Sequence, residues 1–180
     1  MKLEGSQTEK NLYRTFAGEC RARTKYNFYA EEAVCEGYRW IAEVFNQIAD
    51  TEKAHAREAY RRYLNKIGDV ESNLKDSIKG ELEENRKVYK KYEEEAREEG
   101  FKEIADFFKE LQEVEEIHAI RYSEFLKKLE ENKLYKSDKT ELWECMNCGY
   151  IYEGKEAPEN CPLCKYPRGY FKLVCKSEII

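Results

Sequence analysis

The segment that decides the fold is EGYRWIAEVFNQIADTEKAHA, residues 36–56, because the chain carries it twice. It returns sixty-three residues later as EGFKEIADFFKELQEVEEIHA, residues 99–119. Both copies contain Ile-Ala, a Phe four residues after the Ile, and then Glu-x-x-His. Residues three or four apart share one face of a helix, so each copy predicts a helix whose apolar seam also holds a Glu and a His. The seam positions are Ile41, Phe45, Ile48, Glu52, His55 and Ala59 in the first copy, and Ile104, Phe108, Leu111, Glu115, His118, Tyr122, Phe125 and Leu129 in the second.

The charged seam residues need a chemical explanation. An ionised carboxylate removed from water without a partner costs several kcal/mol or shifts its pKa until it is neutral. A single polar residue in an apolar seam usually has its hydrogen bonds satisfied within the core. Two matching Glu-x-x-His pairs in a repeat are hard to explain that way. Di-iron carboxylate bundles have this motif on two helices and a Glu on each of the other two.

Composition limits the class of protein. The chain has 180 residues, of which 38% are charged and 41% hydrophobic, with a net charge of −5. This suits packed amphipathic helices and gives no support for nucleic-acid or membrane-surface binding. No apolar run approaches the length of a membrane span and the first residues do not resemble a signal peptide, so we expect a cytoplasmic protein.

The remaining predicted helices supply further carboxylates. Residues 6–34 form the first helix, capped by Ser6 with Glu9 as its capping-box partner, and Glu19 follows Gly18 on its seam. The second helix ends near Gly68. The third covers about 73–98 with Gly80-Glu81-x-x-Glu84, and the fourth continues to about Leu129.

Four helices joined by short loops predict a four-helix bundle, and the repeat predicts a pseudo-twofold axis. Two divalent cations would nearly balance the five carboxylates gathered there. Such a donor set suits iron or manganese better than copper, and a calcium site would not need histidine. The predicted metal ligands are Glu19, Glu52, His55, Glu81, Glu84, Glu115 and His118.

The C-terminal part contains two Cys-x-x-Cys pairs, Cys145/Cys148 and Cys161/Cys164. Four thiolates at this spacing can close a tetrahedral site for zinc or for a single iron, and a structural zinc ribbon has the same spacing. About 40 residues build little core, so the metal must help this module to fold. We predict three segments: a helical bundle over 1–134, a linker over 135–141 and a metal-binding domain over 142–180. No role is assigned to Cys20, Cys35 or Cys175.

At this point the sequence resembles the rubrerythrin family over essentially its whole length. The first part is similar to the family's ferritin-like di-iron bundle, through Phe16-Ala17-Gly18-Glu19, Gly80-Glu81-x-x-Glu84 and the two Glu-x-x-His motifs. The second is similar to its rubredoxin-like domain, through Cys-x-x-Cys-Gly-Tyr and Ala157-Pro158-Glu159-x-Cys161-Pro162-x-Cys164. The resemblance implies a mainly α fold: a ferritin-like four-helix bundle with a small C-terminal rubredoxin-like β/loop domain. Two positions depart from the family pattern, Val88-Tyr89-Lys90 in place of Met-Tyr-Pro, and Lys165 in place of Gly.

The resemblance also implies an activity, the reduction of hydrogen peroxide to water in oxidative-stress defence. The implied cofactors are three Fe per subunit, two in the bundle and one on the four cysteines, with Zn substitution possible. Glu52 and Glu115 are implied to bridge the two bundle metals, and His55 to alternate with Glu84 as a ligand when the redox state changes. Glu19, Glu81, Glu84 and His118 are implied as terminal ligands. Tyr26 and Tyr89 resemble tyrosines that hydrogen-bond ligating carboxylates, although they can equally be core aromatics.

The implied partners are hydrogen peroxide, or dioxygen, as substrate, and rubredoxin or a flavoprotein NAD(P)H-dependent reductase as electron donor. The family is typically a homodimer or larger oligomer. Two other functions stay open: ferritin-like iron oxidation and storage, and a peroxide or redox sensor whose cysteines hold structural zinc.

Overall fold

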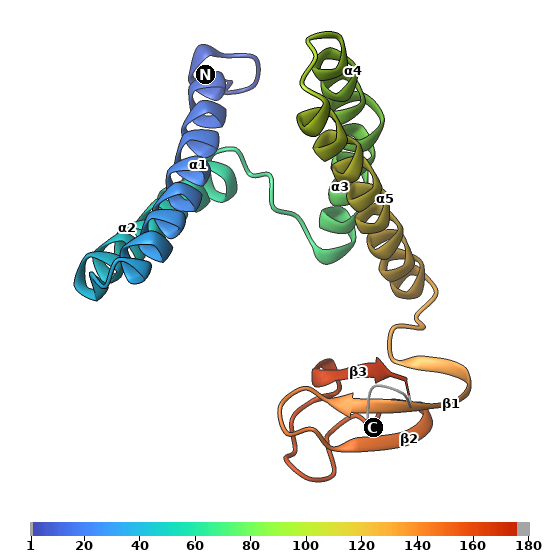
Figure 1. Ribbon diagram of the computed structural model, residues 1–180. Coiled ribbons are helices and arrows are strands. Elements are labelled where there is room, and N and C mark those ends of the chain that lie inside the picture. The colour runs from blue at the N-terminus through green and yellow to red at the C-terminus, as the bar shows by residue number, and fades with distance from the viewer. Residues whose placement is uncertain (1, 176–180) are drawn as a thin grey trace. The chain divides into compact units, whose positions relative to one another are not determined.

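The computed structural model describes residues 2–175, which divide into two compact units at residues 69 and 70. The first unit is a helical hairpin, and the second contains three further α-helices and a small sheet. We describe each unit by itself (Figure 1). The mainly helical class with a small C-terminal sheet is confirmed.

The first unit pairs helix α1 (Gln7–Cys35) with helix α2 (Arg39–Arg57), which continues as the π-helical turn η1 (Glu58–Tyr63). Ser6 caps α1 as predicted, because its Oγ accepts a hydrogen bond from the Glu9 N–H at 3.0 Å. The Glu9 carboxylate accepts from the N–H of Gly5 instead of that of Ser6, so the capping box is shifted by one residue. Figure 1 shows α1 and α2 lying side by side.

The second unit begins with helix α3 (Val70–Glu83), the π-helical segment η2 (Glu84–Tyr89) and helix α4 (Lys90–Glu98), all of which pack on helix α5 (Lys102–Glu130). The sequence predicts one uninterrupted helix over 73–98. In the structure this helix is interrupted by the six residues of η2, which have i→i+5 hydrogen bonding. The wider turn changes the direction in which later side chains point.

The sequence repeat produces the same turn twice. Gly37 and Gly100 both have φ of +88°, a left-handed conformation that glycine adopts without steric cost. In the first turn the N–H of Tyr38 donates to the carbonyl of Ala33 at 2.7 Å. In the second turn the N–H of Phe101 donates to the carbonyl of Ala96 at 2.8 Å. Both hairpins therefore turn through a Schellman motif, which fixes how α1 meets α2 and how α4 meets α5.

Small residues form the contact line inside each hairpin. Three pairs of alanines occupy matching positions of the repeat and all six are buried, with Ala105 fully buried. The predicted seam beside them is more exposed: Ile41 and Ile104 keep 50% and 48% of their surface. Each hairpin thus buries its alanine line, while parts of its seam stay exposed. The paired alanines are Ala33 and Ala96, Ala42 and Ala105, and Ala56 and Ala119.

The C-terminal sheet has the antiparallel order β2-β1-β3, with β1 (Lys136–Cys145), β2 (Ile151–Glu156) and β3 (Phe171–Val174), and a 3-10 turn η3 (Arg168–Tyr170) before β3. Residues 136–141, which the sequence suggested as linker, are the first part of β1 and pair irregularly with β2. Cross-strand pairing organises this polar stretch, and such non-local pairing leaves no periodic signal in a short segment. Trp143 is fully buried at the centre of this sheet, and its Nε1–H donates to the Gly154 carbonyl at 2.9 Å.

Candidate metal centres

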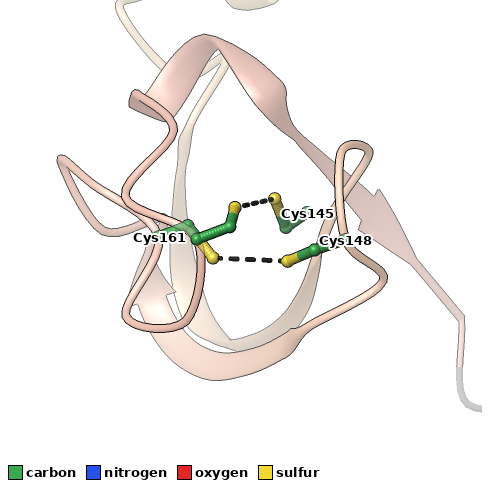
Figure 2. Close-up of side chains that lie close together, drawn as sticks. Cys145, Cys148 and Cys161 are labelled. Carbon is green, nitrogen blue, oxygen red and sulfur yellow. Dashed lines mark hydrogen bonds between the residues drawn. The ribbon is translucent and has the colours of Figure 1, made fainter.

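The four predicted cysteine ligands converge in the C-terminal domain. The Sγ atoms of Cys145 and Cys164 lie 3.7 Å apart, as do those of Cys148 and Cys161. Figure 2 shows the labelled cysteines pointing toward one another from two separate turns. A tetrahedron of about 2.3 Å metal–sulfur bonds has edges of about 3.8 Å, so the observed spacing fits a tetrathiolate site.

Two backbone turns present these sulfurs. The N–H of Gly149 donates to the Cys145 carbonyl at 2.8 Å, and the N–H of Lys165 donates to the Cys161 carbonyl at 2.9 Å. The residue after each Cys-x-x-Cys has positive φ, +73° for Gly149 and +64° for Lys165. Lys165 therefore occupies a conformation that favours glycine, and its Nζ donates to the Pro162 carbonyl at 2.9 Å.

The thiols interact strongly with one another. Hydrogen bonds from the Tyr166 backbone and the Asn147 side chain lower the pKa of Cys164 to about 6, which favours the thiolate that metals bind. At Cys148 the Tyr150 backbone bond also lowers the pKa, but desolvation and the three other thiols outweigh it and raise the pKa to about 12. Four adjacent sulfurs resist carrying four negative charges together, so a cation is the natural counterpart of this site.

The first unit brings together three predicted ligands, Glu19 from α1 and Glu52 and His55 from α2, whose donor atoms lie within 4.8 Å of one another. The Nδ1 atom of His55 lies 2.9 Å from Oε2 of Glu52. The His55 side chain is 60% exposed, whereas that of Glu52 is 18% exposed. Desolvation, followed by the hydrogen bond and charge of Glu52, raises the pKa of Glu19.

The second unit contains the matching group, Glu81 from α3 and Glu115 and His118 from α5, again within 4.8 Å. The Nδ1 atom of His118 lies 2.8 Å from Oε2 of Glu115 and 3.6 Å from Oε2 of Glu81. Desolvation, followed by the hydrogen bond and charge of Glu115, raises the pKa of Glu81. We call these two groups the first and second half-sites. In both half-sites burial is the main cause of the raised carboxyl pKa, and the neighbouring carboxylate adds to it.

Glu84, the seventh predicted ligand, lies outside the second half-site. It is exposed and begins the π-helical segment η2, where the three-residue spacing from Glu81 no longer fixes a common face. Burial is the main cause that raises the pKa of Tyr89. The charges of Glu84 and other carboxylates, and a hydrogen bond with Glu84, raise this pKa further. Tyr89 therefore interacts with Glu84, and its role beside a metal ligand stays a prediction.

The second predicted tyrosine, Tyr26, packs in an aromatic group. Its ring centroid lies 6.2 Å from that of Phe45 and 6.3 Å from that of Tyr29. An interaction that sequence analysis missed is the stacking of Phe16 on Tyr60, at 4.3 Å between centroids. The sequence feature that could have indicated this stacking is Phe16 itself, an aromatic residue three positions before the predicted ligand Glu19.

The fold and the three donor sets define a class, proteins with a carboxylate–histidine metal site on helices and a tetrathiolate site on a small sheet. Comparison with known proteins identifies the family. The rubrerythrin family model matches residues 10–126 and, in a second match, 72–147, and the model of the rubrerythrin rubredoxin-like domain matches 143–172. The chain belongs to the rubrerythrin family, whose members are di-iron redox proteins.

Individual relatives match over nearly their full length. The chain is 37% identical to rubrerythrin-1 of Clostridium acetobutylicum, over 97% of this chain and 98% of the relative. It is 39% identical to a rubrerythrin of Porphyromonas gingivalis, over 94% and 91%. Among solved structures, partially reduced nigerythrin is 28% identical over 94% of this chain and 87% of the other, with a TM-score of 0.37. Within the described residues, no helix is long and apolar enough to cross a membrane.

Proposed function

We propose that this protein is a peroxide reductase with a dinuclear iron site in the bundle and a mononuclear iron on the four cysteines. The observation that carries the proposal is that one chain holds two matching Glu-Glu-His half-sites and a tetrathiolate site. Iron bound at these sites would supply the two electrons that, with two protons, convert hydrogen peroxide to two molecules of water.

The donor chemistry supports iron in the bundle. Each half-site offers two carboxylates and one imidazole, a set that suits iron or manganese. Two divalent cations would compensate the two carboxylates of each half-site, where burial, followed by the neighbouring carboxylate, raises the pKa of Glu19 and of Glu81. We propose that Glu52 and Glu115 bridge the metals and that Glu19, Glu81, Glu84 and His118 are terminal ligands, with His55 alternating with Glu84.

The protein's own residues would also manage protons. Tyr89 has a raised pKa and therefore keeps its phenolic proton at neutral pH, where it can donate a hydrogen bond to Glu84. That bond would orient Glu84 as a ligand. The Nδ1 atoms of His55 and His118 face the carboxylates, so these are the ring atoms we propose as metal donors.

The tetrathiolate site supports electron relay. Iron held by four thiolates gains or loses one electron at a time. Two successive electron transfers from it would therefore return the dinuclear site to its reduced state. The four sulfurs fit that iron, and they fit zinc equally well in spacing, so metal identity decides between relay and structural roles. A rubredoxin or a flavoprotein reductase is the proposed source of electrons.

The decisive experiment is an anaerobic titration of the fully reduced protein with hydrogen peroxide, with metal content measured in parallel. The iron–thiolate and di-iron absorption bands report separately. We expect about one peroxide per dinuclear site to oxidise the bundle rapidly and the thiolate iron to follow. An iron-loaded protein that reacts with dioxygen and accumulates ferric iron, but not with peroxide, would show storage instead. Zinc on the cysteines after reconstitution with iron, together with slow single turnover, would show a sensor.

A further inference from the structure

The two cysteine turns share one backbone conformation but differ in the side chain at one position. Gly149 and Lys165 each follow the second cysteine of a Cys-x-x-Cys pair, and their φ values are +73° and +64°. This left-handed conformation suits glycine and strains a residue that has a Cβ. A Cβ at Gly149 would meet no heavy atom within 4 Å beyond its chain neighbours, so a side chain there has room. Backbone strain, and not crowding, is what opposes a lysine in such a turn.

Burial does not explain why Lys165 occupies the strained position. The residue is exposed, as are Pro162 and Leu163 of the same turn, so its side chain removes little apolar surface from water. It donates a hydrogen bond from Nζ to the Pro162 carbonyl instead, at 2.9 Å. A backbone outlier that gains no burial points to a use for its side chain.

The hydrogen bond fixes where the positive charge lies. Pro162 stands between Cys161 and Cys164 in the chain, so the ammonium of Lys165 is folded back onto the turn that carries two of the four sulfurs. Within residues 2–175 no carboxylate oxygen pairs with Lys165. Its charge is therefore free to act on the cysteine cluster, at a range over which salt screens only partly.

Neighbouring cations of the domain are neutralised differently. Arg168 pairs with Glu156 at 2.6 Å, and Lys172 pairs with Glu144 at 3.0 Å. The matching turn has Gly149 at this position and brings no charge. The positive field on the cluster is therefore one-sided, and it comes from the turn of Cys161 and Cys164.

A fixed positive charge acts unequally on the two redox states of an iron held by four thiolates. The four thiolates and the iron carry a net charge of −1 when the iron is ferric and −2 when it is ferrous. The more negative state gains more from a nearby cation, so the charge favours the reduced state. The change is a one-electron transfer that breaks no bond and moves no proton.

We infer that Lys165 sets the redox balance of the tetrathiolate site, because its ammonium favours the reduced iron and so helps the site to accept electrons from the donor protein. This inference rests on the proposed function for the presence of iron on the four cysteines. Lys165 is a positioning residue that acts through its charge, and the four cysteines remain the ligands.

An equilibrium redox titration of the full-length protein, reconstituted with iron, tests the inference. The iron–thiolate absorption gives the ratio of reduced to oxidised iron at each applied potential. Lys165→Gln keeps a Cβ and a polar side chain but loses the charge. At the wild-type midpoint we expect its ratio to fall by about threefold to tenfold, and tenfold corresponds to about 59 mV for one electron. The difference should shrink in about 1 M salt, which screens an exposed charge.

Matched variants separate charge from turn geometry. Lys165→Arg keeps the charge and should stay within about twofold of the wild-type ratio. Lys165→Gly removes the charge and the strain together, so it should show the same fall as Lys165→Gln, and it serves if that variant binds iron poorly. Lys155→Gln makes the same change of net charge at an exposed residue of β2. Lys155 is four residues beyond Ile151, which pairs with Glu144 beside Cys145, so it lies about 13 Å along the strand and should have little effect.

The outcomes distinguish this inference from the proposed function. An unchanged ratio in both Lys165→Gln and Lys165→Gly, or an equal fall in Lys155→Gln, would overturn the role of Lys165. Peroxide turnover is measured on the same wild-type sample. Turnover with unchanged ratios in the variants contradicts this inference alone, and shifted ratios in a protein that does not reduce peroxide contradict the function alone.

Discussion

The Nδ1 atom of His118 lies 2.8 Å from Oε2 of Glu115. The same two atom types lie 2.9 Å apart in His55 and Glu52, so the repeat reproduces the contact as well as the sequence. A three-residue helical step sets both contacts, and each places an imidazole nitrogen and a carboxylate oxygen where one cation can bind both.

We first predict that the second half-site binds metal independently of the cysteines. Replacing Glu115 with Gln or His118 with Ala should lower the bundle metal content by about tenfold or more, because a ligand is lost from a site with few donors. Elemental analysis should still find the metal on the cysteines. Glu116→Gln changes an exposed neighbour on the same helix and should leave both contents unchanged. Normal bundle loading in both ligand variants would exclude these residues as ligands.

Electron relay through the tetrathiolate predicts the behaviour of Cys161→Ser. The variant should keep its bundle metals but lose reductant-driven peroxide turnover, because the fully buried Cys161 sulfur is replaced by a poor iron ligand. Turnover and the iron–thiolate absorption can be measured on one sample. Cys35→Ser, at an exposed cysteine outside the cluster, is the matched control. Normal turnover in Cys161→Ser would contradict the relay.

Metal removal should unfold the C-terminal domain. The domain is too small to depend on its apolar core alone, so stripping the metal should expose Trp143 and shift its fluorescence to the red. The chain has two tryptophans, so Trp40→Phe leaves Trp143 as the single reporter. The reverse variant, Trp143→Phe, retains Trp40, which is 82% exposed and should show no shift. Unchanged Trp143 emission in a verified metal-free sample would show that the domain folds without metal.

The left-handed conformation of Lys165 predicts a stabilising substitution. Lys165→Gly should raise the stability of the C-terminal domain by roughly 0.5–1 kcal/mol, since a residue with a Cβ is strained at this φ. Gly149→Ala, at the matching position of the other turn, should lower stability by a similar amount. Denaturation followed by Trp143 emission measures both. A destabilised Lys165→Gly would mean that the bond from Lys165 Nζ to the Pro162 carbonyl outweighs the strain.

Stability should also depend on pH through Glu93. Hydrogen bonds from Gln112, at 2.9 Å, and from Arg97 lower its pKa, so the native state prefers the ionised form. The stabilisation is present above the ordinary carboxyl pKa and is lost as pH falls through the lowered value. The melting temperature of the wild type should therefore exceed that of Glu93→Gln at neutral pH, and the two should converge in acid. A difference that persists at the lowest pH would contradict this role.

The sequence by itself determined the local chemistry of this protein. Helical periodicity is local, so spacing alone was enough to pair Glu52 with His55 and Glu115 with His118. Spacing alone also predicted that the two Cys-x-x-Cys turns hold one metal site. Gly37 and Gly100 occupy matching positions of the repeat, and the structure gives both hairpins the same turn there.

Only the tertiary structure decided which faces are covered. The seam of Ile41 and Ile104 has the stronger apolar pattern, but the hairpins close on alanines because small side chains let two helix backbones approach. The π-helical segment at Glu84 and the strand that begins at Lys136 depend on packing and pairing with distant residues, and such interactions have no local sequence period.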